Sequence, residues 1–202
     1  MNAKDYFDNV AETWDYRFKT PKLLSFLERF VPQFDLRAGQ HVLDVGTGTG
    51  VLIPYLVNAV GEFGSVTAID FSEKMVQKCK TKYSRFKNVH IDVRNIEDAG
   101  YSTESFDAVI CFGVFPHLDN KEKALQNINR MLKPSGKLVI AHALSSEELK
   151  NHHQKVSKHV AHAIMPKKTE MNQLLNQTGF IETHIKDEPG SYLCDARKSN
   201  NP

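Results

Sequence analysis

The sequence contains few cysteines, no long apolar run and almost no excess of charge of either sign. Its three cysteines, Cys79, Cys111 and Cys194, include no C-x-x-C pair and leave an odd thiol. This pattern excludes a disulfide framework and favours a cytoplasmic location. No apolar stretch approaches the roughly 20 residues of a membrane-spanning helix, and the polar first residues do not resemble a secretory signal. We therefore expect no membrane insertion.

The formal net charge of the 202 residues is only +2. This balance does not favour nucleic acid as a partner, because binding of a phosphate backbone depends on a strongly positive surface. One basic stretch is present, but aromatic residues do not alternate with its cations as in a platform that stacks bases. We interpret it as a solvated helix face whose cations complement the helix dipole. It comprises Lys74, Lys78, Lys80, Lys82, Arg85 and Lys87.

The composition, 41% hydrophobic and 25% charged, is that of one globular domain over residues 1–202. Short apolar runs alternate with helical patterns, which predicts an α/β fold with a mostly parallel sheet and helices on both faces. The expected strands are 42–45, 66–70, 89–93, 106–112 and 137–143, followed by a hairpin of 180–186 and 191–198. The expected helices are 50–60, 72–82, 121–132 and 169–178.

Two further segments flank this core, which is expected over 39–143 and 169–198. Residues 1–38 carry helical spacing and predict a helical cap. Residues 144–168 form a long polar segment rich in histidine, with His152, His153, His159 and His162. Long excursions of this kind are functional more often than not, and we expect a helical lid from Glu147 to about Ile164.

The segment from Val42 to Gly50 is the first functional signal. A short apolar run ends in Asp44 and is followed at once by Gly46, Gly48 and Gly50. A strand that turns through glycines into a helix lets the backbone approach a ligand closely. The spacing is G-x-G-x-G, not the G-x-G-x-x-G of a dinucleotide site, which points away from NAD. A glycine-rich turn without a ligand is the alternative.

Asp70 ends the second expected strand, 20 residues beyond Gly50. In a βαβ unit this carboxylate lies beside the glycine turn, where it can accept both hydroxyls of a ribose. The alternative role for Asp70 is the N-cap of the following helix, although Ser72 is suited to that position.

Four segments in this order resemble the class I S-adenosylmethionine-dependent methyltransferases, and within them the small-molecule enzymes related to the ubiquinone/menaquinone C-methyltransferases. They are VLDVGTGTG, AIDFSEKMVQKC, SFDAVICFGVFPHL and MLKPSGKLVIAHA. The resemblance covers about residues 5–141 and resumes at 169–198. It implies a Rossmann-like fold with a seven-stranded sheet whose last strand is antiparallel. It also implies S-adenosyl-L-methionine as cofactor and a small-molecule methyl acceptor.

The resemblance places the cofactor on particular residues. It implies that Asp44 lies near the methionine end, with the backbone of Gly46, Gly48 and Gly50, and that Asp70 binds the ribose. Asn95 falls where many members carry an aspartate that reads the adenine amine, and an asparagine oxygen can accept the same bond. The expected apolar neighbours are Phe71, Met75, Ile96 and Phe112, for the last of which core packing is the alternative.

Candidates for the acceptor side come from the strand ends, the lid and the N-terminal segment. His117 and His142 are candidate catalytic residues, since the pKa of histidine lies near neutrality. His152 and His159 are expected to line the substrate. In the resembled family the N-terminal segment folds over the cofactor and substrate, which makes Tyr6, Trp14 and, first among them, Tyr16 candidate pocket residues.

Two substrate classes are disfavoured. The segment from Gly113 to Leu118 lacks the N/D-P-P-Y/F motif with which nucleic-acid amino-methyltransferases hold a base. The three cysteines are not clustered as in enzymes that act on arsenite. A metal site is not expected, although His159 and His162 could share an ion with His142 if the lid folds down.

The sequence thus predicts methyl transfer to a small molecule by in-line displacement, driven by positioning of the acceptor and exclusion of water. A module that binds S-adenosylmethionine without turnover is the first alternative, and a NAD(P)-dependent oxidoreductase is the second. The sequence does not identify the acceptor or the oligomeric state.

Overall fold

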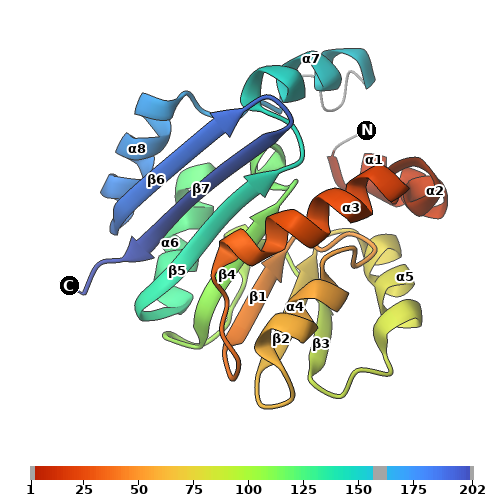
Figure 1. Cartoon of the computed structure of the whole chain (residues 1–202), viewed down its shortest axis with the longest axis horizontal. Coiled ribbons are helices and arrows are strands. Elements are labelled where there is room, and N and C mark those ends of the chain that lie inside the picture. Colours follow the sequence, from red (N-terminus) through yellow and green to blue (C-terminus); the bar gives the residue numbers. More distant parts are fainter. Residues whose placement is uncertain (1–2, 157–162, 201–202) are drawn as a thin grey trace. The chain divides into compact units, whose positions relative to one another are not determined.

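The computed structural model describes residues 3–156 and 163–200. The chain divides into two compact units, Met1–Asn95 and Ile96–Pro202, and each is described by itself (Figure 1). In the part of the chain that the structure describes, every helix is too short or too polar to cross a bilayer.

Unit 1 begins with the predicted helical segment. Its helices are α1 (Ala3–Val10), η1 (Ala11–Thr13), α2 (Trp14–Phe18), α3 (Pro21–Phe30) and η2 (Val31–Phe34). The start of α3 has a clear cause, because the Thr20 hydroxyl accepts the Leu23 N–H at 3.2 Å and Pro21 occupies the first helical position.

The sheet of unit 1 has three parallel strands in the order β3-β2-β1. The elements are β1 (His41–Val45), α4 (Ile53–Val60), β2 (Ser65–Asp70), α5 (Glu73–Tyr83) and β3 (Val89–Val93). The strands are close to their predicted ranges. Helix α4 begins at Ile53 and not at residue 50 as predicted, because Gly50, with φ +88°, still belongs to the turn.

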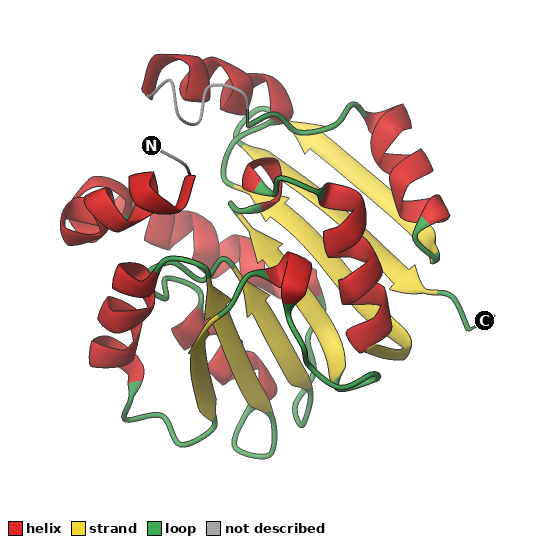
Figure 2. Cartoon of the chain, turned by 180° about the vertical axis from the view of Figure 1, so that it is seen from behind, coloured by secondary structure: helices red, strands yellow, loops and turns green. Residues whose placement is uncertain are grey.

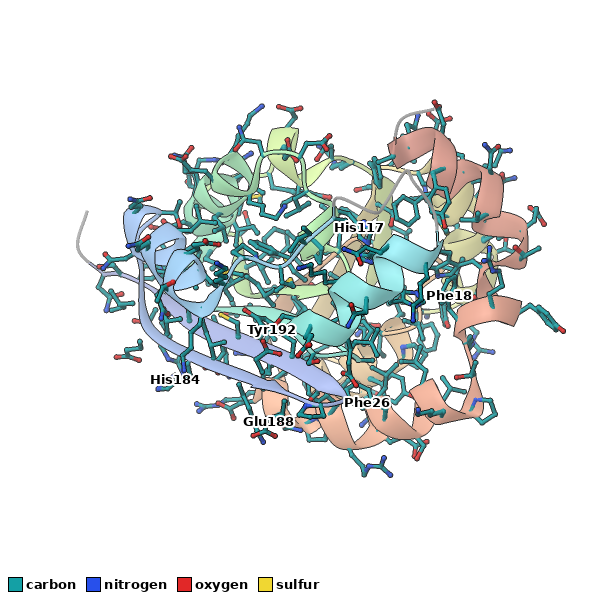
Figure 3. The ribbon with its side chains drawn as sticks, turned by 90° about the horizontal axis from the view of Figure 1, so that it is seen from above. Phe18, Phe26, His117, His184, Glu188 and Tyr192 are labelled. Carbon is teal, nitrogen blue, oxygen red and sulfur yellow. The ribbon has the colours of Figure 1, made fainter. Side chains whose placement is uncertain are left out.

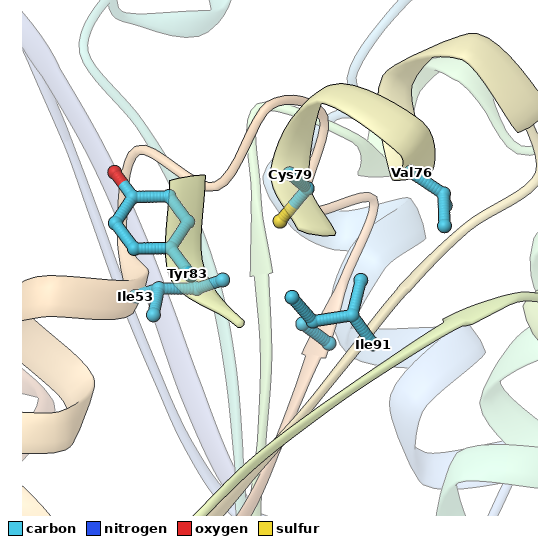
Figure 4. Packing of buried hydrophobic residues seen from close by; sticks show 6 residues of the cluster. Ile53, Val76, Cys79, Tyr83 and Ile91 are labelled. Atoms are coloured by element: carbon cyan, nitrogen blue, oxygen red, sulfur yellow. The ribbon is translucent and has the colours of Figure 1, made fainter. Parts of the chain in front are cut away.

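A buried apolar cluster joins α4 and α5 to the strands of unit 1 (Figure 4). Its members are Ile53, Ala68, Val76, Cys79, Tyr83 and Ile91. Burial of such a side chain contributes about 1.5–3 kcal/mol relative to leaving it in water. This cluster fixes α5 against β2 directly beneath the glycine turn, so the turn rests on a packed base.

Unit 2 contains four strands in the order β4-β5-β7-β6, of which β7 is antiparallel to both neighbours. The strands are β4 (Phe106–Phe112), β5 (Leu132–His142), β6 (Phe180–Glu188) and β7 (Ser191–Lys198). The helices are η3 (Ile96–Asp98), η4 (Phe115–His117), α6 (Lys121–Met131), α7 (Ser146–Val156) and α8 (Lys168–Gln177). Figure 2 shows α6 and α8 on one face of these strands. The predicted α/β class, with seven strands and an antiparallel last strand, is confirmed.

The structure describes the predicted lid helix over part of its range. Helix α7 spans Ser146–Val156, and residues 163–167 have no helical structure. Pro166 disfavours helical backbone at Met165, the residue before it. Residues 157–162 lie outside the described residues.

Candidate functional site

The loop after β1 passes through left-handed backbone at each of its three glycines. Gly46, Gly48 and Gly50 have φ angles of +69°, +56° and +88°, a region that residues with a Cβ atom rarely adopt. The Gly46 N–H donates to the carbonyl of Ile69 in β2 at 2.8 Å. The backbone conformation therefore explains why glycine stands at these positions.

Gly50 is required by packing as well. A Cβ atom here would lie 2.5 Å from Cε2 of Tyr83 and 2.8 Å from Sγ of Cys79, both in α5. These distances are too short for any side chain, so the third glycine allows the loop to lie directly on the helix. Its predicted contact with a cofactor stays a prediction.

Asp70 holds the glycine loop from the end of β2. Its Oδ2 accepts a hydrogen bond from the Gly48 N–H at 2.9 Å, and its Oδ1 accepts one from the Ser72 N–H at 2.9 Å. Ser72 is the N-cap of α5, because its hydroxyl accepts the Met75 N–H at 3.2 Å. The Phe71 N–H also acts on this carboxylate and lowers its pKa. Since an ionised carboxylate has about four lone-pair positions, Asp70 can still accept a hydrogen bond from a ribose hydroxyl.

Asp44 in β1 and Thr47 in the glycine loop carry buried side-chain oxygens. Oδ2 of Asp44 and Oγ1 of Thr47 have no hydrogen-bond partner among the described residues. Burial raises the pKa of Asp44 to about 7; the neighbouring Thr47 hydroxyl acts against this rise, and the charge of Asp70 adds to it. Burial likewise raises the pKa of Asp70 to about 6. Buried polar atoms without partners are rare, so a bound polar group would complete this site.

A carboxylate from the N-terminal helices binds the loop directly. Asp15 in α2 accepts hydrogen bonds from the Thr49 hydroxyl and from Nζ of Lys82 in α5. Lys82 also donates to the Thr49 carbonyl at 3.3 Å. Burial alone would raise the pKa of Asp15, but these two donors hold it below its usual value. The last turn of α5, the loop and α2 are therefore joined through one carboxylate.

Further contacts continue this connection along α1, η1 and α5, which lie side by side in Figure 1. They are Lys4 Nζ to Glu73 Oε1 at 2.8 Å, Lys78 Nζ to Glu12 Oε2 at 2.8 Å, and Ser72 Oγ to Asp8 Oδ1 at 2.6 Å. The interpretation of the basic stretch as a solvated face is therefore wrong for Lys78 and Lys82. These two cations bind the N-terminal helices because acidic residues recur there at helical spacing.

Aromatic side chains of the N-terminal helices lie over the same loop. The indole nitrogen of Trp14 lies 3.7 Å from the position that a Cβ of Gly48 would take. The Phe7 ring contacts Trp14 and Phe71 at centroid distances of 5.7 and 5.8 Å. Tyr16, in contrast, is 92% exposed. Trp14, and not Tyr16, therefore has the position expected of a residue that lines the site.

The other predicted cofactor residues lie in both units. Met75 is buried in the first turn of α5. Asn95 is exposed and follows Arg94, whose N–H donates to the Asp70 carbonyl at 2.9 Å. The start of the segment after β3 is thus held beside Asp70. Ile96 belongs to unit 2, where it is buried in η3.

His117 lies in η4, in the loop that follows β4. Nζ of Lys121 fixes this loop by donating to the carbonyls of Pro116 at 3.2 Å and Leu118 at 2.9 Å. The His117 ring lies 4.8 Å from the ring of His153 in α7. Helix α7 and the end of β4 therefore share a cluster of histidines.

His142, the last residue of β5, belongs to the same end of unit 2. Its ring stacks on Phe112, the last residue of β4, at a centroid distance of 6.4 Å. Burial lowers the pKa of His142 to about 4, with His153 and His152 acting in the same direction. A histidine whose pKa is lowered in this way is a weak proton acceptor, and the predicted catalytic role of His142 stays a prediction.

Helix α7 presents His153, and not the predicted His152, to the interior of unit 2. His153 is 5% exposed, and its Nδ1 lies 2.6 Å from the Ala163 carbonyl, whereas the predicted His152 is exposed. The spacing from Leu149, which is also buried, identifies the inward face, because residues four apart share a face of a helix. His159, the other predicted lining residue, lies outside the described residues.

The start of α7 is fixed to the β6–β7 hairpin. Ser145 and Glu148 form reciprocal cap bonds, from the Ser145 N–H to Glu148 Oε2 at 2.9 Å and from the Glu148 N–H to Ser145 Oγ at 3.2 Å. The same Glu148 oxygen accepts the Gly190 N–H at 2.8 Å, and Asp187 accepts the Ser146 N–H at 2.9 Å. The first turn of α7 is thus a fixed part of unit 2.

No group of three or more His, Cys, Asp or Glu suited to a metal ion occurs within residues 3–156 and 163–200. The suggested sharing of an ion by His142, His159 and His162 depends on two residues outside the described part of the chain.

A methyltransferase domain model matches residues 36–182. The chain is 37% identical over 148 residues to a ubiquinone/menaquinone biosynthesis C-methyltransferase of Hydrogenovibrio crunogenus, which covers 68% of this chain and 57% of that protein. It is 30% identical over 155 residues to an O-methyltransferase of Aspergillus sclerotiorum, which covers 74% of this chain and 58% of that protein.

Among solved structures, a SAM-dependent methyltransferase from Aquifex aeolicus superposes with a TM-score of 0.76 at 26% identity, covering 94% of this chain and 97% of that one. The chain spans about half of the length of the curated relatives that it matches. The matched share is 57% and 58% for the two relatives above and 49% for an uncharacterised protein of Methanocaldococcus jannaschii.

Proposed function

Since this chain belongs to the methyltransferase domain family, we propose that it transfers a methyl group from S-adenosylmethionine to a small organic acceptor. The family, the Rossmann-like fold and the cofactor that the sequence predicted are confirmed by the family model and by a structure of a SAM-dependent methyltransferase that superposes along nearly the whole chain. The acceptor and the residues that bind it are part of the proposal.

The single observation that carries the proposal is the state of the loop after β1. Asp70 already holds the loop through Gly48 and Ser72, and a carboxylate has capacity for a further donor. Among the described residues, Oδ2 of Asp44 and Oγ1 of Thr47 are buried without a hydrogen-bond partner. Ribose hydroxyls would donate to Asp70, and an ammonium group would donate to Asp44. The residues present therefore fit the two polar ends of S-adenosylmethionine.

When bound, S-adenosylmethionine supplies a methyl carbon activated by a positively charged sulfur. The chain's contribution is to orient the reactants and exclude water, which together can supply most of the rate enhancement of such a displacement. Asp44 and Asp70 orient the donor, and Trp14 with Phe7 shields the loop from solvent. No acid–base residue is essential for an acceptor that is already nucleophilic.

A small organic acceptor is supported by the loop after β4, which lacks the base-gripping motif, and by the net charge of +2. The relatives named above include a C-methyltransferase and an O-methyltransferase, so the methylated atom is left open. The buried free thiols Cys79, Cys111 and Cys194 accord with the expected cytoplasmic location.

The test combines binding and turnover. We expect Asp70→Ala to abolish S-adenosylmethionine binding in calorimetry while circular dichroism retains the wild-type helix content. Asp98→Ala is the matched control, because Asp98 is an exposed aspartate paired with Lys123. Near wild-type affinity in Asp70→Ala would overturn the site. S-adenosylhomocysteine formation with a panel of metabolites separates an enzyme from a module that only binds the cofactor.

A further inference from the structure

Two buried polar atoms of unit 2 have no partner within the described residues. They are Nδ1 of His142 and the hydroxyl oxygen of Tyr192. A buried polar group without a hydrogen bond costs about 1–3 kcal/mol. Unsatisfied atoms of this kind call for a hydrogen-bonding group that the described residues do not supply.

The two residues are direct partners in the sheet. His142 ends β5, and the register pairs it with Tyr192 near the start of β7. Opposed residues of antiparallel strands project from the same face, with Cβ atoms about 4.5–5.5 Å apart. Tyr192 is 2% exposed, and Figure 3 shows it inside unit 2, whereas His184 and Glu188 of β6 lie at the outer edge.

Both groups are uncharged at neutral pH. Burial lowers the pKa of His142 to about 4, and burial raises the pKa of Tyr192 well above its usual value. The neighbouring His153 and His152 also lower the pKa of His142. Cys194 and Asp187 also raise the pKa of Tyr192. Asp187 itself is engaged, because it accepts the Ser146 N–H at 2.9 Å.

We propose that Tyr192 and His142 bind an uncharged oxygen group of the methyl acceptor, either a hydroxyl or a carbonyl, and select against charged acceptors. The inference rests on the proposed function and deepens it by assigning two residues of unit 2 to the acceptor. The phenol of Tyr192 donates a hydrogen bond, and Nδ1 of the neutral imidazole accepts one or donates one according to its tautomer.

The same pair disfavours charged groups. Burying an ion requires an opposite charge or several hydrogen bonds, and a single phenol and a single neutral imidazole supply neither. An ammonium group would lack a free carboxylate, and a phosphate would lack a guanidinium or ammonium partner. Stacking of His142 on Phe112 adds a flat face that suits a planar acceptor. A trapped water molecule is the competing occupant.

The experiment uses three probes of one shape on the full chain: 2-naphthol, which is neutral, 2-naphthoate, which is an anion, and 2-(aminomethyl)naphthalene, which is a cation. Their dissociation constants are measured at pH 7 by NMR titration with wild type and Tyr192→Phe. We expect wild type to bind 2-naphthol at least about tenfold more tightly than either ion, and Tyr192→Phe to weaken 2-naphthol binding by about fivefold to tenfold, the loss of one hydrogen bond.

Tyr16→Phe is the matched control, since it removes the same hydroxyl from a side chain that is 92% exposed; its probe affinities should equal those of wild type. Thermal melts show whether Tyr192→Phe stays folded. Equal binding of 2-naphthol by wild type and Tyr192→Phe, the result of a trapped water, overturns the proposal. So does equal binding of neutral and charged probes, or no binding of 2-naphthol. Calorimetry with S-adenosylmethionine on the same samples reports separately on the proposed function.

Discussion

The Thr49 hydroxyl, in the glycine loop, donates a hydrogen bond to the Asp15 carboxylate of α2. Thr49 is only 3% exposed, so this bond ties the N-terminal helices to the loop that the proposed function assigns to the cofactor. Lys82 holds the second oxygen of the same carboxylate. Asp15 is thus a positioning residue, which acts on the loop and not on the ligand.

Replacement of Asp15 with Ala removes the acceptor from both Thr49 and Lys82. We expect the affinity for S-adenosylmethionine to fall by about threefold to tenfold, since each lost hydrogen bond contributes about 0.5–1.5 kcal/mol. The expected loss of stability is of similar size, because the ion pair is partly exposed and screened. Calorimetry and thermal melts measure the two effects.

Thr49→Val tests the same contact from the other side with Asp15 and Lys82 still paired. Its loss in affinity should be smaller than that of Asp15→Ala. Glu62→Ala, at an exposed loop position, is the control for removal of a carboxylate. An Asp15→Ala protein that binds the cofactor as tightly as the control would show that the N-terminal helices do not position the loop.

The buried carboxyls predict how cofactor binding depends on pH. Burial raises the pKa of Asp44 to about 7 and that of Asp70 to about 6. Because the folded-state pKa lies above the unfolded value, these groups favour folding below about pH 4 and lose that contribution as the pH rises to about 7. A ligand with hydroxyl and ammonium donors prefers the ionised carboxylates, so binding should lower both pKa values.

The expected result is an affinity for S-adenosylmethionine that increases between pH 5 and pH 8, by at most about tenfold per pH unit for each proton released. Calorimetry in two buffers with different ionisation enthalpies measures the released protons. Asp44→Asn should reduce both the slope and the number of protons. An affinity that is constant across this range would show that the carboxyls are already ionised without ligand.

Alanine variants of Gly50 and Gly61 distinguish the cost of backbone strain from the cost of overpacking. Both have positive φ, +88° and +67°, but a Cβ at Gly50 would meet Tyr83 at 2.5 Å, whereas nothing lies within 4 Å of one at Gly61. We expect Gly61→Ala to cost about 1–3 kcal/mol, from the backbone alone, since its ψ of −167° is rarely adopted by other residues at positive φ. Gly50→Ala should cost about 2–4 kcal/mol, because overpacking of about 1–3 kcal/mol adds to the strain of its own left-handed backbone.

Urea unfolding measures the difference between the two glycine variants directly. A similar loss for both would mean that α5 moves aside, and the packing argument for the third glycine would then be wrong. The measurement is independent of any ligand.

The strands and helices of the core could be predicted from the sequence because their apolar residues recur at strand or helix spacing. The glycine-rich turn could be predicted because three glycines follow a short apolar run directly. Asp15 could not be assigned, since its partners Thr49 and Lys82 lie 34 and 67 residues away in the sequence. No local pattern encodes such pairing. Lys4, Asp8 and Glu12 recur at intervals of four, which puts them on one face of a helix, but this spacing does not tell what that face contacts.

The candidate residues of the acceptor side differ in how far the sequence predicts them. His153 was identifiable in principle, because its spacing of four from Leu149 marks the inward face of α7. Tyr192 was not, since its proximity to His142 depends on the register of β5 with β7. Register is set by the whole sheet and by the turn at Gly190, so a tyrosine with an unused hydroxyl looks like any core aromatic until the strands are paired.

Glu148 connects α7 to the hairpin through one carboxylate oxygen, which accepts the N–H groups of Ser145 and Gly190. We expect Glu148→Ala to destabilise the start of α7 by about 1 kcal/mol, the usual effect of losing a helix cap. Amide hydrogen exchange should accelerate in the first turn of α7 and at Gly190, while the protection of β4 and β5 stays unchanged. Glu147→Ala removes the adjacent exposed carboxylate and serves as the matched control. If both variants exchange alike, the Glu148 bonds do not hold the start of α7, and the bonds from Ser146 to Asp187 are then what connects it to the hairpin.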